Sequence, residues 1–307
     1  MSSIQQIEFK AIDGITLRGQ IYPAEGPGPA IVLSPGSNCV IDMLGLPDVA
    51  KAFQHASITA LIYDPRSTGL SDGMPRNGID PLKQVEDMSN ALTFMSGCPT
   101  VIPDQMGIWG FSLGGAVALS VASLDKRAKM VIAICPVSEY QYSPEKLPKV
   151  LAKCIKDRES QIKGNEPYYI PMINEAGENP AGFNFGANKT EEAKIFQAVQ
   201  KAGMEGVASH HVNRTTIQSY YRLVVWQPSH LWVHLDPTPV LFVVPQLDCL
   251  CPPSVQRRYF DALSGPKHWH LEKGRGHRDI TQRDHLPDLM RVKIDFMRNA
   301  LSGRVGE

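Results

Sequence analysis

The chain has 307 residues, and its 31 lysines and arginines are balanced by 31 aspartates and glutamates. This balance argues against a nucleic-acid-binding protein and against a protein held to an anionic membrane, because both depend on clustered basic side chains. We find no secretory signal, no apolar segment of about 20 residues and no CxxC spacing among the six cysteines. We therefore expect a cytoplasmic protein with reduced thiols, without a metal and without a cofactor.

The N-terminal segments are expected to form a β-hairpin, since residues 4–10 and 15–22 flank Asp13-Gly14, a dipeptide typical of tight turns. Continuous apolar runs follow, which is typical of strands buried on both faces of a parallel sheet. The runs are 30–36, 58–64, 105–110, 129–136 and 238–245, and a further strand is expected at 267–272. Helix-length segments lie between them at 47–56, 80–96 and 113–123. This alternation predicts an α/β fold with a doubly wound, mostly parallel sheet and an antiparallel start.

One region interrupts the alternation. Between residues 138 and 237 the sequence holds no buried-strand run; it has helical segments at 144–158, 190–203 and 213–226 and a loop at 164–188. Ligands bind at the carboxyl edge of open α/β sheets. We therefore expect a first core part at 1–137, a mainly helical lid at 138–237 over that edge, and a second core part at 238–307.

A GxSxG motif marks the candidate nucleophile, Ser112. The motif Gly110-Phe111-Ser112-Leu113-Gly114 follows a buried strand and opens an Ala/Val/Leu-rich helix. A strand-to-helix turn this tight leaves no room for β-carbons beside the serine, which explains the flanking glycines. The hydroxyl is then expected at the edge of the sheet, above the free amides of a helix N-terminus.

A serine nucleophile requires a base, and the base requires an orienting acid. Asp248 follows the strand run at 239–245, and His277 lies on a glycine-rich loop after 267–272. Either residue alone would be unremarkable, because a loop aspartate is usually a turn residue and a lone histidine is usually a surface group. The order Ser112, Asp248, His277, each after a different strand, predicts a catalytic triad.

Acyl chemistry also needs donors for the oxyanion. We expect one donor to be the backbone N–H of Leu113, directly after the nucleophile. The second is expected to be the amide of Ser37, in the loop after the strand at 30–34, where Gly36 allows a close approach to substrate. Gly36 and Phe111 are therefore predicted to contact substrate, whereas Cys39 is expected to have a packing role.

These motifs resemble the α/β-hydrolase superfamily. The run from Asp64 through Arg66 and Gly69 to Ser71 resembles its D-x-R-x-x-G-x-S segment. Several stretches further resemble the fungal polyketide transferase and thiohydrolase family of secondary metabolism. They are 37–39, 75–81, 84–87 and 124–129, and the resemblance is dense over 30–136, thinner over 239–280 and weak across 138–237. Many relatives have His-Gly where this chain has Pro35-Gly36.

The resemblance implies action on the acyl thioesters of polyketide synthases, with release of the acid or transfer to an acceptor. We therefore expect a serine hydrolase or acyltransferase that forms an acyl-enzyme from a small acyl substrate, free or attached to a carrier protein. The acyl group is expected to lie beneath aromatic side chains of the lid, each of which is equally compatible with a place in the lid core. They are Tyr168, Tyr169, Phe183 and Trp226, together with Phe185, Tyr220 and Tyr221.

Two alternatives stay open at the level of sequence. The same triad could use His277 as a proton shuttle for cyclisation, condensation or isomerisation, without net hydrolysis. The fold could also be a ligand-binding receptor with an unused triad. The sequence does not separate hydrolysis from transfer, because both share the acyl-enzyme, and it leaves the oligomeric state open, a homodimer included.

Overall fold

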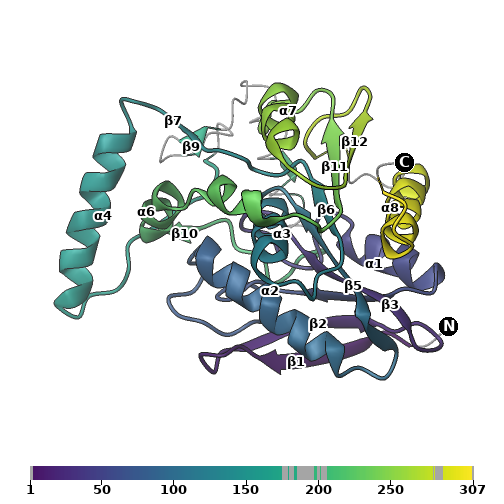
Figure 1. Ribbon diagram of the computed structural model, residues 1–307. Coiled ribbons are helices and arrows are strands. Elements are labelled where there is room, and N and C mark those ends of the chain that lie inside the picture. The colour runs from purple at the N-terminus through teal and green to yellow at the C-terminus, as the bar shows by residue number, and fades with distance from the viewer. Residues whose placement is uncertain are drawn as a thin grey trace.

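The computed structural model describes residues 3–174, 179, 183–184, 197–198, 201, 206–278, 280 and 286–305. Within them, eight strands form one sheet in the order β1-β2-β4-β3-β5-β6-β11-β12 (Figure 1). The strands are β1 (Gln5–Lys10), β2 (Thr16–Tyr22), β3 (Gly28–Ser34), β4 (Thr59–Tyr63), β5 (Val101–Phe111), β6 (Val131–Ile134), β11 (Val240–Pro245) and β12 (Lys267–Glu272). β2 runs antiparallel to β1 and β4, and the neighbours from β4 to β12 are parallel.

Helices cover both faces of the sheet (Figure 1). They are α1 (Leu46–His55), α2 (Pro81–Ser96), α3 (Leu113–Leu124), α7 (Pro253–Ala262) and α8 (Leu286–Leu301). Along β3, Ala30 and Val32 pack on the side of α2, α3 and α7, whereas Ile31 and Leu33 pack on the side of α1 and α8. Successive side chains of a strand point to opposite faces, so a strand covered on both faces must be apolar throughout. The predicted α/β sheet with an antiparallel start is confirmed.

The first hairpin differs from the expected tight turn. Five residues, 11–15, connect β1 and β2, and the Ala11 amide donates to the Ile15 carbonyl (2.8 Å). Gly14 supplies the positive φ of +84° that the loop needs. The longer loop presents the Asp13 carboxylate to Arg66, whose Nη1 donates to it over 2.9 Å. The turn therefore also ties the hairpin to the loop after β4.

The chain between β6 and β11 lies outside the main sheet. Its described elements are β7 (Gln141–Tyr142), α4 (Leu147–Ile162), β8 (Tyr169–Ile170), β9 (Phe183–Asn184), β10 (Thr215–Thr216), α6 (Gln218–Val225) and the 3-10 helix η1 (Pro228–His234). β7 pairs with β9 and β8 with β10, so the helix expected at 213–226 begins only at Gln218. Most of the helix expected at 190–203 lies outside the described residues. Among the described helices, none combines the length and apolar character needed to cross a bilayer.

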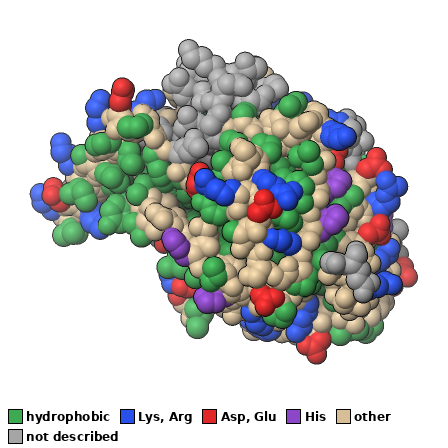
Figure 2. All heavy atoms as spheres, turned by 45° about the horizontal axis from the view of Figure 1, so that its top comes forward, with side chains coloured by type: hydrophobic (Ala, Val, Ile, Leu, Met, Phe, Trp, Pro, Cys, Tyr) green, Lys and Arg blue, Asp and Glu red, His purple; other side chains and the backbone are tan. Residues whose placement is uncertain are grey.

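Helix α4 stands at the left of the molecule, and Figure 2 shows hydrophobic side chains gathered on this part. Ile155 is 47% exposed and Ile162 is 82% exposed. The opposite side of α4 packs through Val150 and Cys154 against α6. These contacts attach α4 to the rest of the segment between β6 and β11.

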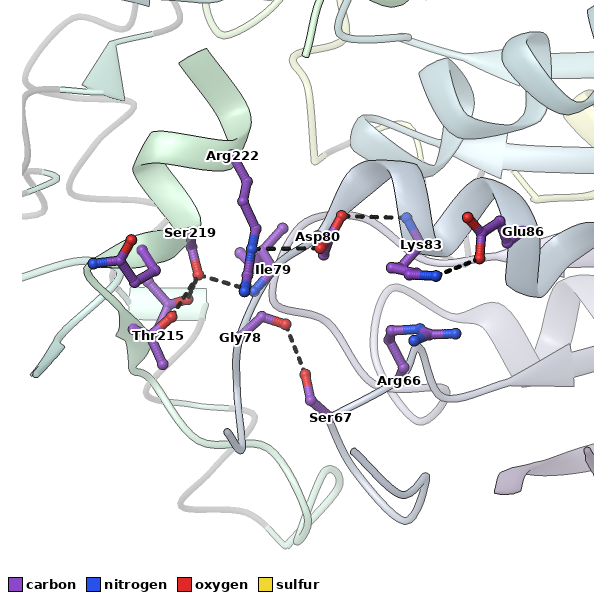
Figure 3. A network of polar contacts seen from close by, with 12 residues as sticks. Arg66, Ser67, Gly78, Ile79, Asp80, Lys83, Glu86, Thr215, Ser219 and Arg222 are labelled. Carbon is purple, nitrogen blue, oxygen red and sulfur yellow. Dashed lines mark hydrogen bonds and ion pairs between the residues drawn. The ribbon is translucent and has the colours of Figure 1, made fainter. Parts of the chain in front are cut away.

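A polar network fastens the segment between β6 and β11 to the loop before α2 (Figure 3). The Thr215 hydroxyl donates to the Asn77 carbonyl (2.7 Å), and the Ile79 amide donates to the Ser219 hydroxyl (2.9 Å). Arg222 adds an ion pair of 3.4 Å to Asp80, the residue that also caps α2. Except for this ion pair, the contacts are buried from solvent, where hydrogen bonds are costly to lose. Residues 77–80 and 215–222 therefore form one joined unit, which we call the loop–α6 junction.

A buried lysine lies beneath the sheet. Lys293 of α8 is 3% exposed, and its Nζ lies 5.6 Å from the ring centroid of Trp109 in β5. Burial lowers the pKa of this ammonium to about 8, and the nearby charge of Glu272 and thiol of Cys135 oppose the shift only in part. The charged form of Lys293 is therefore unfavourable in the folded protein.

This shift predicts a pH-dependent cost in stability. The unfolded chain has a lysine pKa near 10.4, so between pH 8 and about 10.4 the unfolded state binds more protons and the free energy of unfolding rises with pH. Below pH 8 the buried charge of Lys293 lowers the free energy of unfolding by its full amount, about 3 kcal/mol. We expect Lys293→Met to raise the free energy of unfolding at pH 7 and the difference from wild type to shrink towards pH 9.5. Urea unfolding of both proteins at several pH values measures this difference in the free energy of unfolding. A difference that does not change with pH would contradict the lowered pKa of Lys293.

Candidate active site

Ser112 occupies a strained turn between β5 and α3. Its backbone has φ +56° and ψ −117°, a conformation that non-glycine residues rarely adopt. The Ser112 amide donates to the carbonyl of Ile134 at the end of β6 (2.9 Å), which holds the turn against the neighbouring strand. The hydroxyl is thereby presented at the carboxyl edge of the sheet, as the GxSxG motif predicts.

The glycines beside Ser112 are required by close backbone contacts. A β-carbon on Gly110 would lie 1.9 Å from the carbonyl oxygen of Gly114. A β-carbon on Gly114 would lie 2.4 Å from the carbonyl oxygen of Pro35. Both distances are far below van der Waals contact, so the turn accommodates no side chain at either position. The sharp turn and the adjacent β3 loop therefore depend on the same two glycines.

The three residues expected to act together are hydrogen-bonded in series. His277 Nε2 lies 3.1 Å from Ser112 Oγ, and His277 Nδ1 lies 2.9 Å from Asp248 Oδ2. All three are buried, with 8, 5 and 3% exposure for Ser112, His277 and Asp248. With the proton on Nδ1 directed at the carboxylate, Nε2 can accept the serine proton. The arrangement can therefore convert the hydroxyl into a nucleophile.

The Asp248 carboxylate is fixed by its own partners. Oδ1 accepts from the amides of Leu250 (2.9 Å) and Cys251 (2.8 Å), and Oδ2 accepts from Gln256 Nε2 (3.4 Å) as well as from His277. These hydrogen bonds fix the orientation of the carboxylate towards His277. Gln256 is fully buried and was not identified from the sequence, because only the α7 packing brings it to Asp248.

The loop after β3 runs beside Ser112. A β-carbon on Gly36 would lie 3.0 Å from Cδ1 of Phe111 and 3.5 Å from Cβ of Ser112. The Phe111 ring, itself buried, packs 5.1 Å from the imidazole ring of His277 between centroids. Ser37 follows Gly36 and is partly exposed. Leu113 follows Ser112 directly at the start of α3, and Ser37 follows Gly36 in this loop, so their roles as oxyanion donors stay a prediction.

The aromatic residues expected around the acyl group differ in exposure and in packing partners, and their contact with substrate stays a prediction. Tyr168 is 51% exposed, and Tyr169 lies beneath the guanidinium of Arg214, 4.5 Å from the ring centroid. Trp226, at the end of α6, is partly buried. It packs against the core that lies between the sheet and helices α2, α3 and α7, and also against a smaller cluster formed by α6 and the start of α3. The side chain of Phe183 and the whole of Phe185 lie outside the described residues.

One of the expected aromatic residues, Tyr220, belongs to the apolar cluster at the start of α3. Leu113 packs in a cluster with Ile79 and with Tyr220, which is fully buried. Tyr140 and Tyr142, from the segment after β6, pack against the same cluster. No pattern in the sequence places Ile79, Tyr140 or Tyr142 in this cluster. The loop–α6 junction and the pairing of β7 bring these residues to it from positions far apart in the chain.

Cys135 is a second unexpected neighbour of the site. It follows β6, is fully buried, and its Sγ lies 3.9 Å from His277 Nε2. Burial and the charge of Asp248 raise the pKa of this thiol well above its usual value. Among the described residues, Cys135, Asp248 and His277 are the one group of three whose potential metal-ligand atoms lie within 4.8 Å of one another.

Comparison with known proteins places the chain in a family. The sequence profile of the family described as "Serine aminopeptidase, S33" matches residues 29–282. A thiohydrolase of Eupenicillium brefeldianum is 47% identical over 294 residues, which cover 96% of this chain and 94% of that protein. The polyketide transferase ATR5 of Stachybotrys chlorohalonatus is 40% identical over 297 residues, covering 97% of each. The chain belongs to the α/β-hydrolase family of fungal thiohydrolases and polyketide transferases.

The solved structures extend the likeness to three dimensions. The structure of DcsB in complex with its substrate analogue matches this α/β-hydrolase with a TM-score of 0.91 and 38% identity, covering 98% of this chain and 100% of that one. The resemblance expected from the motifs is thereby confirmed, as is the α/β-hydrolase fold. The likeness spans almost the whole chain, including the segment between β6 and β11, where the sequence motifs were weakest.

Proposed function

We propose that this α/β-hydrolase cleaves or transfers acyl groups from thioesters or esters of polyketide type, through an acyl-enzyme on Ser112. The observation that carries the proposal is the buried hydrogen-bond series Ser112–His277–Asp248 at a strained strand-to-helix turn. The names of the relatives, thiohydrolase and polyketide transferase, support the same substrate class.

The reaction follows from the positions of the groups. Ser112 Oγ attacks the acyl carbonyl as His277 Nε2 takes its proton, and Asp248 stabilises the imidazolium that forms. The amides of Leu113 and Ser37 donate to the oxyanion, an effect of about 3 kcal/mol per donor. His277 then protonates the leaving thiolate or alkoxide. Water, an alcohol or an amine attacks the acyl-enzyme, with His277 again as base.

We also propose that residues 138–237 act as a lid and contribute to selection of the acyl group. Tyr220 packs with Leu113 in one cluster, so a side chain of this segment lies next to the expected oxyanion donor. The substrate enters as a small acyl thioester, free or attached to a carrier protein, and no resident cofactor is needed. The six cysteines, all within the described part of the chain, form no disulfide, which supports the proposal of a cytoplasmic location.

Intact-protein mass spectrometry tests the proposal. Wild type and Ser112→Ala are mixed with acyl N-acetylcysteamine thioesters of increasing chain length, with and without small alcohols or amines. We expect an acyl adduct on wild type alone, followed by free acid or, with an acceptor, a new ester or amide. Equal turnover by Ser112→Ala would overturn the nucleophile assignment and favour His277 as a proton shuttle. Tight binding of thioesters without turnover would favour a receptor.

The Gly36 contact predicts sensitivity of the rate to one methyl group. Gly36→Ala places a β-carbon at 3.0 Å from Phe111, which must shift the β3 loop or the ring that packs on His277. We expect kcat/KM to fall about 10-fold to 100-fold, because small displacements of catalytic groups are costly. Gly26→Ala, where nothing lies within 4 Å of the added carbon, is the matched control. Unchanged kcat/KM in Gly36→Ala would show that this loop does not position reacting groups.

A further inference from the structure

A thiol that the proposed reaction does not use lies directly beside its base. Cys135 Sγ is 3.9 Å from His277 Nε2, the nitrogen that also faces Ser112 Oγ at 3.1 Å. Cys135 has a positive φ of +37°, which non-glycine residues seldom adopt, and its amide donates to the Val243 carbonyl (2.9 Å). The backbone therefore directs this side chain into the site from the end of β6.

Sulfur, nitrogen and oxygen atoms at these separations match the coordination of zinc. With Zn–S near 2.3 Å and Zn–N near 2.0–2.1 Å, a tetrahedral ion sets its sulfur and nitrogen ligands about 3.6 Å apart and its nitrogen and oxygen ligands about 3.3 Å apart. The observed 3.9 Å and 3.1 Å differ from these values by a few tenths of an ångström. Two of the three separations that such a site requires, both measured from His277 Nε2, are therefore close to the values for zinc.

Asp248 completes the arrangement without ligating the ion. Metal-bound histidines commonly donate their second ring N–H to a carboxylate, which orients the ring and increases its basicity. His277 Nδ1 already has this partner in Asp248 Oδ2 at 2.9 Å, and the other carboxylate oxygen is held by two backbone amides. The imidazole is thus set in the tautomer whose Nε2 lone pair, which faces Ser112 Oγ, can bind a cation.

We propose that Cys135, His277 and Ser112 form an inhibitory site for a thiophilic divalent cation, Zn²⁺ or Cd²⁺, with water as the fourth ligand. Cys135 binds as the thiolate, so its proton is released to the buffer as the metal–sulfur bond forms, and no electron is transferred. The ion occupies Nε2 and Oγ together, so neither can start acyl transfer while it is bound. The site depends on the positions of these atoms and not on the identity of the acyl substrate.

Direct binding of Cd²⁺ tests the site without any substrate. Ultraviolet absorption detects sulfur-to-cadmium charge transfer, and calorimetry gives affinity and stoichiometry for wild type, Cys135→Ser and Cys98→Ser. Cys98, a partly buried thiol after α2, is the matched control because its Sγ donates to the Phe94 carbonyl of α2 (3.6 Å). We expect one ion with a thiolate band in wild type and Cys98→Ser, and loss of the band with at least tenfold weaker binding in Cys135→Ser. Equal bands in all three proteins would overturn the proposal.

Protection of Ser112 gives a second measurement that needs no variant. Zn²⁺ should slow labelling of wild-type Ser112 by a fluorophosphonate at least tenfold, and EDTA should restore the rate. Full labelling at zinc concentrations that saturate the calorimetric site would overturn the proposal. If the metal-free protein is not labelled while the cadmium–thiolate band is present, the proposed nucleophile fails and the metal site stands, so the two failures are distinguishable.

Discussion

Asp248→Asn should lower kcat for thioester cleavage by about 10⁴-fold while leaving the fold intact. The reason lies in the two backbone amides, from Leu250 and Cys251, that donate to Oδ1. These donors select the carbonyl oxygen of the new amide, so its NH₂ group takes the position of Oδ2 and faces His277. The NH₂ group donates to Nδ1, the ring proton moves to Nε2, and Nε2 no longer accepts from Ser112.

The measurement is kcat with an acyl N-acetylcysteamine thioester, beside thermal unfolding of the same preparations. Asp104→Asn is the control, since the Asp104 side chain is 93% exposed and lies at the start of β5, at the other end of the strand from Ser112. A fall in kcat of less than tenfold in Asp248→Asn, with normal thermal stability, would mean that the reaction does not depend on the His277 tautomer.

Asp87→Ala should lower the free energy of unfolding by about 3–5 kcal/mol, because it leaves a buried guanidinium without its carboxylate. Arg66 donates from Nε (2.7 Å) and Nη2 (2.5 Å) to the two oxygens of Asp87. The Arg66 side chain is 9% exposed and that of Asp87 is 1% exposed, so water cannot replace the lost partner. Urea unfolding measures the change.

The second partner of Arg66 provides the internal control. Asp13 also accepts from Arg66, but its side chain is 32% exposed, so Asp13→Ala should cost about 1 kcal/mol or less. The double variant Arg66→Met/Asp87→Leu should recover much of the loss of Asp87→Ala, because it leaves no buried guanidinium that lacks its buried carboxylate partner. Equal losses in the free energy of unfolding for Asp87→Ala and Asp13→Ala would contradict the conclusion that burial makes Asp87 the more costly partner to remove.

The parts of the fold that could be predicted from sequence are those in which the cause is local. The apolar run of β3 reflects burial on both faces, and Gly110 reflects contacts within one turn. The order of Ser112, Asp248 and His277 could be used because each follows a strand, and parallel strands bring their carboxyl ends to one edge. Their distances from one another required the structure.

The parts that could not be predicted depend on partners distant in sequence. Asp13 was interpreted as part of a tight turn, yet its carboxylate pairs with Arg66, 53 residues away. Thr215 was assigned to a helix, but it pairs with Ile170 of β8. Cys135 had no motif of its own, and only the sheet order, with β6 between β5 and β11, places it beside His277.

The loop–α6 junction determines how this enzyme can be recombined with its relatives. Thr215 and Ser219 bond to the backbone of Asn77 and Ile79, and Arg222 bonds to the side chain of Asp80. A chimera that exchanges only the segment between β6 and β11 would separate these partners and leave buried donors and acceptors unmatched. Exchanged together with residues 75–80, the segment carries its own attachment, so the transferable unit is discontinuous in sequence although continuous in space.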